Sequence, residues 1–344
     1  MDTITHALFG AVCAAAVTRP SSPPAKELHL RMAVTGVAAA FPDIDYLGFW
    51  IDPLLFLADW HRSATHSLLL MPLWAALLGS CFMLWPRARK QGIAIFVLCC
   101  LGILSHIPLD LLTVFGIRIL YPLSDTSYSL GITFFIDGYI SAILAATLIY
   151  FLWRPSQQVA LNGLLLLSLY LGSHWLLKTE AQRIAAGAFI GSSDLHVLPQ
   201  PFSPFYWQLI HRSGDDYQVA YLSLLSEDEA LITAYRGART LDWQQRQLLG
   251  PQDELKPLAG EAWADPQFQK FRAFARFPVL YRVDREHGES CVWFTDLRYT
   301  LPYLIPAFRY GMCREREGSW RLYRLKRFTE RERQPLFTGT SAPD

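Results

Sequence analysis

Long apolar runs without a charged side chain fill the first half of the chain. Four of them are uncharged over 16 to 19 residues: Ser67–Trp85, Gly92–Leu109, Gly138–Trp153 and Val159–Leu177. About 20 apolar residues cross the hydrocarbon core of a bilayer as a helix, and shorter runs can cross when flanking side chains reach the head groups. The pattern therefore predicts transmembrane helices within residues 1–177.

Two apolar segments precede these runs. Thr3–Val17 has the length of a short span, and its basic residues follow rather than precede it, so we expect no cleaved signal peptide. Met32–Phe41 is about half a span, which favours a tilted, broken or re-entrant helix. With the later segments extended to Gly92–Leu112 and Ile132–Trp153, we predict a polytopic helical membrane domain of about five to six spans.

From Lys178 onward, short aromatic and aliphatic runs alternate with turn-forming clusters, which is typical of strands and hairpins. The predicted hairpins pair Phe205–Arg212 with Tyr217–Leu225 and Val279–Arg285 with Ser290–Asp296, and Trp320–Phe328 is a further predicted strand. Helices are expected at Leu225–Gly237, Thr240–Leu249 and Glu261–Arg272. The fold class is thus mainly α, with a membrane domain (1–177), a linker (178–204) and a smaller soluble α+β domain (205–344).

Charge separates the two halves. Of the 344 residues 18% are charged, and residues 1–177 hold only 9 of the 31 Lys and Arg and 9 of the 30 Asp and Glu. Soluble domains average about 25% charged residues, so the two halves suit different solvents. Each half is close to neutral and has no basic patch, so we expect no nucleic-acid partner.

Basic residues in short loops predict the orientation of the spans. They lie at Arg19, Lys26, Arg31, Arg87, Arg89, Lys90 and Arg154, in alternate loops that share one side. That side should be cytoplasmic, because cytoplasmic loops carry an excess of Lys and Arg. Both termini, the soluble domain and nine polar residues then lie on the external side. The nine are His6, Asp43, Asp45, His61, His66, His106, Asp110, Asp125 and Asp137.

The spacing within this group suggests a metal site, because ionisable residues in or beside spans are costly unless they pair or bind an ion. Asp43 and Asp45 follow Pro42, which favours a turning backbone, and His106 and Asp110 are neighbours on one helix face. His61 and His66 stand at the mouth of a span. Seven positions exceed the four ligands of a closed zinc site, so either two metals share carboxylates or some residues only orient ligands. The seven are His6, Asp43, Asp45, His61, His66, His106 and Asp110.

Imidazole and carboxylate donors suit a divalent metal, with zinc the first candidate and manganese, iron or magnesium as alternatives. Each pair also has a simpler explanation. Asp43 and Asp45 could end a helix at the interface, and His61 with Arg62 could form a basic collar at the head groups. His106 and Asp110 could satisfy each other within one helix, and Asp137 could be structural.

Four segments occur in order along the first half, with Gly116 and Pro122 beyond them. They are Met1-Asp-Thr-Ile-Thr-His-Ala-Leu-Phe-Gly10, Pro42-Asp-Ile-Asp45, His61-Arg-Ser-Ala-Thr-His-Ser67 and Ser105-His-Ile-Pro-Leu-Asp-Leu-Leu-Thr113. Together they resemble the bacterial membrane-bound metal-dependent hydrolase family of the YdjM type, over roughly residues 1–155. Trp60, Ala64 and Ile117 depart from the family pattern, and the loop near Leu130-Gly131 lacks its Trp-Asp pair.

The resemblance implies an inner-membrane protein in which all seven residues bind one or two metal ions and a metal-activated water cleaves an ester or phosphoester. Asp45 or Asp110 would accept a proton from that water, and Arg62 would stabilise anionic charge. Asp137 and Thr113 match the family motif as residues that support the ligands. A site at head-group depth favours membrane lipids and a lipid-like or phosphoester substrate as partners.

Two other functions fit the same residues. A divalent-cation transporter would carry them through the membrane's depth and often show two related halves, whereas these gather on one side. A non-catalytic membrane scaffold would use the metal structurally. In a periplasmic C-terminal domain, Cys291 and Cys313 could form a disulfide or remain two free thiols.

Overall fold

The computed structural model describes residues 1–18, 25–190, 194–225, 233–286, 288–315, 318–327 and 329–336. The chain divides into two compact units. The helical unit consists of Met1–Leu47, Trp60–Glu180 and Pro199–Pro204. The β-sheet unit consists of Gly48–Asp59, Ala181–Leu198 and Phe205–Asp344.

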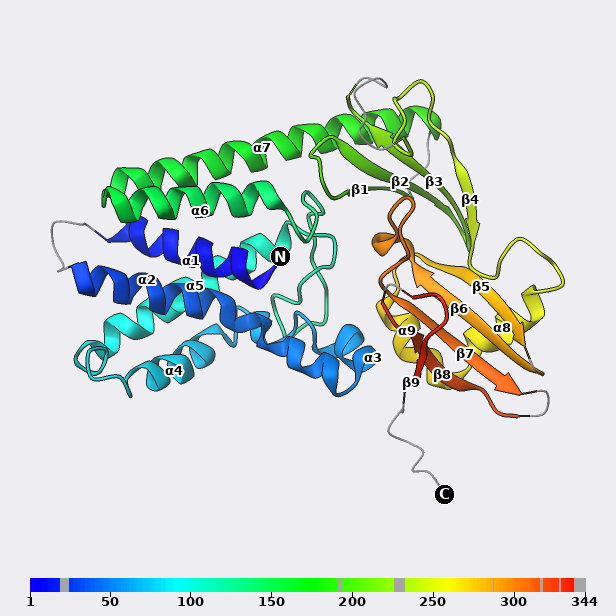
Figure 1. The fold of residues 1–344 in the computed structure, drawn as a ribbon, viewed down its shortest axis with the longest axis horizontal. Coiled ribbons are helices and arrows are strands. Elements are labelled where there is room, and N and C mark those ends of the chain that lie inside the picture. Colours follow the sequence, from blue (N-terminus) through cyan, green and yellow to red (C-terminus); the bar gives the residue numbers. More distant parts are fainter. Residues whose placement is uncertain are drawn as a thin grey trace. The chain divides into compact units, whose positions relative to one another are not determined.

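The helical unit is a bundle whose longer helices overlap the apolar segments of the sequence (Figure 1). The bounds differ most at α2, which begins seven residues before Met32, and at α7, which continues eleven residues beyond Leu177. They are α1 (Thr3–Val17), α2 (Ala25–Ala40), α4 (Met71–Phe82), α5 (Gly92–Leu111), α6 (Gly138–Trp153) and α7 (Gln157–Ala188). Short helical turns join them: η1 (Phe41–Trp50), η3 (Ala64–His66) and η4 (Arg89–Gln91). Helix α2 packs against α1 and α5, while α4 covers another side of α5.

Two glycines allow the helices around α2 to approach closely. A Cβ atom on Gly10 of α1 would lie 2.5 Å from Ala39 Cβ, and one on Gly102 of α5 would lie 2.5 Å from the Thr35 carbonyl oxygen. Both distances are far below ordinary carbon contacts of about 3.5–4.0 Å. Helices α1 and α5 therefore press on the last two turns of α2, directly before the segment that carries Asp43 and Asp45.

The expected five to six spans are not confirmed. Within the described residues, Arg89–Leu111 and Gln157–Ala188 are long and apolar enough to cross a membrane, and Pro53–His66 with Met71–Phe82 would make a third if this bent pair counts as one broken span. Helices α1 and α6 are apolar but have 15 and 16 residues. At 1.5 Å per residue they measure about 22–24 Å, short of the roughly 30 Å hydrocarbon core.

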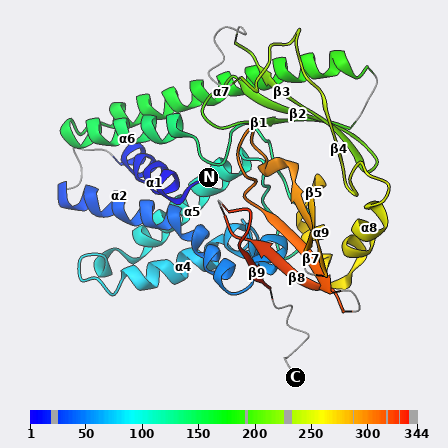
Figure 2. The ribbon, with the colours of Figure 1, turned by 45° about the vertical axis from the view of Figure 1, so that its right-hand side comes forward.

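The β-sheet unit contains two antiparallel sheets, shown from a second side in Figure 2. The first has the strand order β1 (Leu195–Pro199), β2 (Tyr206–Ser213), β3 (Asp216–Ser223) and β4 (Gln244–Gln247). The second runs through β5 (Pro278–Glu286), β6 (Glu289–Asp296), β7 (Arg309–Glu315), β8 (Arg321–Leu325) and β9 (Arg333–Pro335). Both predicted hairpins are confirmed as β2–β3 and β5–β6, and the predicted strand near Trp320 is β8.

The structure differs from the sequence prediction at the three predicted helices of this unit. Thr240–Leu249 is wrong as a helix: it contains strand β4, because Gln244–Gln247 pair with β3 and this pairing overrides their helix propensity. Glu261–Arg272 is helical but interrupted at Pro266, giving α8 (Lys256–Ala264), η6 (Pro266–Phe268) and α9 (Gln269–Phe274). Most of Leu225–Gly237 lies outside the described residues, and its described end makes a bridge at Arg236 instead of a helix.

Three further features of the sequence have a defined structure. Residues 178–204, expected as a linker, hold the end of α7 and strand β1. Cys291 and Cys313 stand opposite each other on β6 and β7 and form a disulfide, which decides between the two states left open by the sequence. Gly48–Asp59, with α3 (Pro53–Leu55) and most of η2 (Phe56–Trp60), belongs to the β-sheet unit although the chain on both sides of it belongs to the helical unit.

Candidate metal centre

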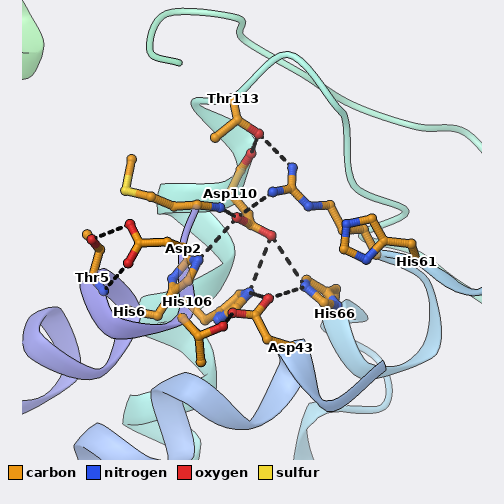
Figure 3. Close-up of polar contacts among 12 residues, drawn as sticks. Asp2, Thr5, His6, Asp43, His61, His66, His106, Asp110 and Thr113 are labelled. Carbon is orange, nitrogen blue, oxygen red and sulfur yellow. Dashed lines mark hydrogen bonds and ion pairs between the residues drawn. The ribbon is translucent and has the colours of Figure 1, made fainter. Parts of the chain in front are cut away.

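The helical unit brings all seven predicted ligands into one neighbourhood, and Figure 3 labels all of them except Asp45. His6 comes from α1, Asp43 and Asp45 from η1, and His106 and Asp110 from α5. His61 lies in the turn after η2, and His66 ends η3. The ligand atoms of His6, Asp43, His106 and Asp110 all lie within 4.8 Å of one another, a spacing that could hold a metal ion.

Helix packing explains why residues so distant in sequence meet. His6 lies four residues before Gly10 and His106 four residues after Gly102, so each imidazole shares a helix face with a glycine that presses on α2. Their rings stack with centroids 3.6 Å apart and an angle of 15° between the planes. The close approach of the helices thus places the His6 and His106 rings side by side in the site.

Asp110 divides its two carboxylate oxygens between two tasks. Oδ1 accepts from Arg62 Nη2 at 2.9 Å, lies 3.2 Å from His6 Nε2 and also accepts from the amino group of Met1. Oδ2 has no hydrogen-bond partner, although it is fully buried, and lies 3.3 Å from both His66 Nε2 and His106 Nε2. Oδ1 therefore has its hydrogen-bond partners within the protein, and Oδ2 faces two imidazole nitrogens.

Asp43 shows the same division. Its Oδ2 accepts from the Thr3 hydroxyl at 2.7 Å. Its Oδ1 faces His106 Nε2 at 3.8 Å and His66 Nε2 at 3.9 Å. A carboxylate held at one oxygen and presented with the other is typical of a metal ligand whose orientation is fixed by a neighbour.

The outward nitrogens of the two central imidazoles define their tautomers. His106 Nδ1 lies 2.7 Å from the Ala39 carbonyl oxygen, and since a carbonyl only accepts, Nδ1 carries the proton. Nε2 of a neutral His106 then presents a lone pair toward Asp43 and Asp110. His66 Nδ1 contacts the Thr65 hydroxyl at 2.9 Å and Asp45 Oδ2 at 3.6 Å, which favours the same tautomer.

These four atoms fit a divalent ion. His66 Nε2, His106 Nε2 and Asp110 Oδ2 are buried without a hydrogen-bond partner. Each of these two imidazole nitrogens lies 3.3 Å from Asp110 Oδ2 and 3.8–3.9 Å from Asp43 Oδ1. A tetrahedral zinc with bonds of about 2.0–2.2 Å separates its ligand atoms by about 3.4 Å. Buried lone pairs that converge in this way are costly unless a cation shares them. His66, His106, Asp43 and Asp110 would hold the ion, and His6 belongs to the same group of possible ligands.

Asp45 and His61 form a separate pair beside this group. His61 Nδ1 lies 3.3 Å from both oxygens of Asp45, and the Arg62 backbone N–H donates to Asp45 Oδ2 at 2.9 Å. Burial raises the pKa of the Asp45 carboxyl, but the His61 and His66 imidazoles and the Arg62 N–H outweigh burial and hold that pKa below its ordinary value. The His61 side chain is 16% exposed, whereas those of His66 and His106 are fully buried.

Arg62 does not form a collar at the head groups, because it is only 4% exposed. Its guanidinium donates to Asp110 Oδ1 and, at 2.6 Å, to the Thr113 hydroxyl, and it lies over the Phe115 ring. The Arg62 backbone adopts a positive φ of 58°, a conformation that non-glycine residues rarely adopt. Arg62 thus supports Asp110 through its side chain and Asp45 through its backbone, and Thr113 supports Arg62.

Asp137 lies outside this neighbourhood. It caps the N-terminus of α6 by accepting from the backbone N–H groups of Tyr139 and Ile140, and it also accepts from the Tyr170 hydroxyl on α7. These contacts make it a structural carboxylate, the alternative that the sequence left open. Asp125 is 80% exposed in its side chain and faces Arg118 at 4.0 Å.

Two participants were missed by the sequence analysis. The Ala39 carbonyl orients His106, and no side-chain pattern announces a backbone acceptor. The Met1 amino group contacts Asp110 in the buried site, although the sequence motif drew attention only to His6.

A bundle of apolar helices around buried histidines and aspartates defines a membrane protein with a candidate metal centre. The family model described as YdjM inner membrane protein matches residues 1–181, which is more than half of the chain. The protein therefore belongs to the YdjM inner membrane protein family, as its motifs suggested. No curated protein and no solved structure matches the chain.

Proposed function

We propose that this protein is a metal-dependent hydrolase of the inner membrane that cleaves an ester or phosphoester of a lipid-like substrate at the external membrane face. The convergence of four ligand atoms from His66, His106, Asp43 and Asp110, three of them buried without a hydrogen-bond partner, carries the proposal. Zinc is the first candidate, because the donors are imidazoles and carboxylates.

A divalent ion in this position would supply Lewis-acid polarisation of the substrate oxygen and a water that ionises near neutral pH. Of the two carboxylates considered as the base, Asp45 suits proton transfer better than Asp110. The oxygens of both carboxylates are engaged, but Asp110 is fully buried, whereas Asp45 contacts His61, whose side chain is 16% exposed. The Arg62 N–H fixes the Asp45 carboxylate, so proton acceptance needs little reorganisation.

Exposed apolar side chains near the acidic motif favour an amphiphilic substrate. Ile44 and Leu47, on the same short helix as Asp43 and Asp45, are 49% and 63% exposed. Such side chains suit contact with acyl chains or lipid, while the carboxylates beside them suit a polar reacting group. The description of the family as an inner membrane protein supports the same substrate class.

We further propose five to six spans with the β-sheet unit in the periplasm. The disulfide between Cys291 and Cys313 supports an oxidising compartment, and the basic loops of the membrane half support the same orientation. Protease added to spheroplasts tests this: the β-sheet unit should be digested in intact spheroplasts, and protection until lysis would contradict the orientation.

Turnover measurements test the hydrolase. Detergent-purified protein is loaded separately with zinc, manganese, iron or magnesium and assayed on short-chain phosphodiesters and lipid analogues. At saturating metal, Asp45→Asn should lose about 10²–10⁴-fold in turnover, the usual contribution of a general base. If the loaded wild type is inactive throughout, cation uptake by proteoliposomes would favour the transporter, and its absence the scaffold.

A further inference from the structure

The segment Gly48–Asp59 lies between two parts of the candidate metal centre in the chain but packs as part of the β-sheet unit. Two residues separate it from Asp45, and Trp60 alone separates it from His61. At no more than about 3.6 Å per residue, neither connection can absorb a large displacement of the segment. Its position therefore constrains the backbone on both sides of the Asp45–His61 pair.

An ion pair and a cap hold the segment at Asp52. One oxygen, Oδ1, accepts from the backbone N–H groups of Leu54 and Leu55 at 3.0 and 2.9 Å and caps α3. The other, Oδ2, pairs with Lys270 Nζ of α9 at 3.0 Å. Both side chains are partly buried, with 20% of Asp52 and 31% of Lys270 exposed. The capped turn is thus attached to α9, which lies beside it.

Aromatic contacts complete this attachment. The buried Phe56 ring lies edge-on to the Phe49 ring, with centroids 5.9 Å apart. The ring of Phe49 carries the guanidinium groups of Arg324 and Arg327 at 5.2 and 5.8 Å from its centroid. The segment is therefore an integral part of the β-sheet unit.

The two ends of the segment meet at the metal centre. The Asp45 carboxylate, before the segment, contacts His61 Nδ1 and the Arg62 N–H, which come after it. These contacts close the base of a loop whose tip is held by Lys270. Asp45 also faces His66, a ligand of the proposed ion. A shift of Asp52 and α3 would therefore displace the Asp45 carboxylate and, through it, the His66 imidazole.

We propose that the β-sheet unit tunes metal affinity at the centre through the segment Gly48–Asp59, with Lys270 as a positioning residue. This inference rests on the proposed metal centre. It gives the β-sheet unit a function: a ligand or partner that shifts α9 changes the metal affinity of the membrane half. Coupling of this kind is reciprocal, so metal binding must also stabilise the attachment of the segment to α9.

Charge reversal at Lys270 is the sharpest test, since removal of a single partly exposed ion pair has a small effect. Zinc affinity is measured by competition with a chromogenic chelator on the full chain in detergent. Lys270→Glu, which faces Asp52, should weaken zinc binding about fivefold or more, the lower range of typical coupling. Lys270→Arg should bind as the wild type does.

Rescue separates positioning from general damage. Asp52→Asn keeps a capping oxygen for α3 and removes the repulsion, so the Asp52→Asn and Lys270→Glu double variant should return to within about threefold of the wild type. Lys256→Glu is the matched control, because Lys256 pairs with Asp253 at an exposed site of the same unit. Its zinc affinity should equal that of the wild type.

Hydrogen exchange of the wild type gives an independent measurement that needs no variant. Zinc should slow amide exchange in residues 269–274 of α9, in the other unit. Unchanged exchange there, or equal zinc affinity of Lys270→Glu and wild type, would overturn the inference and leave the metal centre standing. A wild type that binds no zinc would overturn both.

Discussion

Replacing Gly102 by alanine should damage the metal centre without touching a ligand. The new Cβ would lie 2.5 Å from the Thr35 carbonyl oxygen, 2.6 Å from Ala38 Cβ and 2.9 Å from the Ala39 amide nitrogen. Ordinary contacts need about 3.5 Å, so α5 and α2 must separate by about 1 Å. Overpacking of this kind costs about 1–3 kcal/mol.

The same displacement acts on His106, one turn further along α5. Its Nδ1 hydrogen bond to the Ala39 carbonyl oxygen is 2.7 Å long, and an added 1 Å or so would break it. Loss of the partner that orients a metal-bound imidazole typically weakens metal affinity about 10–100-fold. We therefore expect Gly102→Ala to lose both thermal stability and zinc affinity.

Thermal unfolding in detergent, with and without zinc, and chelator competition measure the two effects. Gly172→Ala is the matched control, because no atom outside its own helix backbone lies within 4 Å of its Cβ position. This variant should match or slightly exceed the wild type in stability, since alanine favours a helix more than glycine does. If Gly102→Ala melts and binds zinc as the wild type does, the packing explanation of the site is refuted.

Three further changes separate supporting residues from the ion's own ligands. Arg62→Met removes the guanidinium between Asp110 and Thr113 and should weaken zinc binding about 10–100-fold in chelator competition; unchanged affinity would show that Asp110 needs no such support. Asp137→Ala should lower stability by about 1 kcal/mol through loss of the α6 cap, seen as a lower melting temperature, and a loss of bound metal would instead place Asp137 in the centre. Replacing both Cys291 and Cys313 by alanine should destabilise the β-sheet unit to chemical denaturant by about 2–4 kcal/mol, and no change would argue against the disulfide.

Helix positions in the membrane half followed from the hydrophobic pattern. Thr3–Val17 was predicted with the bounds of α1, and Gly92–Leu112 exceeds α5 by one residue. The number of crossings was not predictable in the same way, because the apolar runs of α1 and α6 end before they reach the thickness of a bilayer. Strand β1 was missed, because residues 178–204 were expected to form a linker.

Residue spacing predicted which side chains of the site are neighbours, but not which atoms of those side chains contact each other. His106 and Asp110, four residues apart on one helix, do face each other at 3.3 Å. The sequence could not show that His6 would lie on Oδ1 of Asp110, because that depends on glycine contacts between three helices. It also gave no sign that Gly48–Asp59 would pack in the other unit, since the residues that hold it are more than 200 positions away.

Elemental analysis of the purified protein tests the metal centre itself. Wild type is compared with His66→Ala and His106→Ala, after circular dichroism has shown that both variants fold. We expect about one zinc or other transition-metal ion per chain in the wild type and a large loss in both variants, since each removes one of four converging ligands. A wild type that carries no metal after reconstitution would show that the buried cluster is a hydrogen-bonded network, and the hydrolase proposal would fall with it.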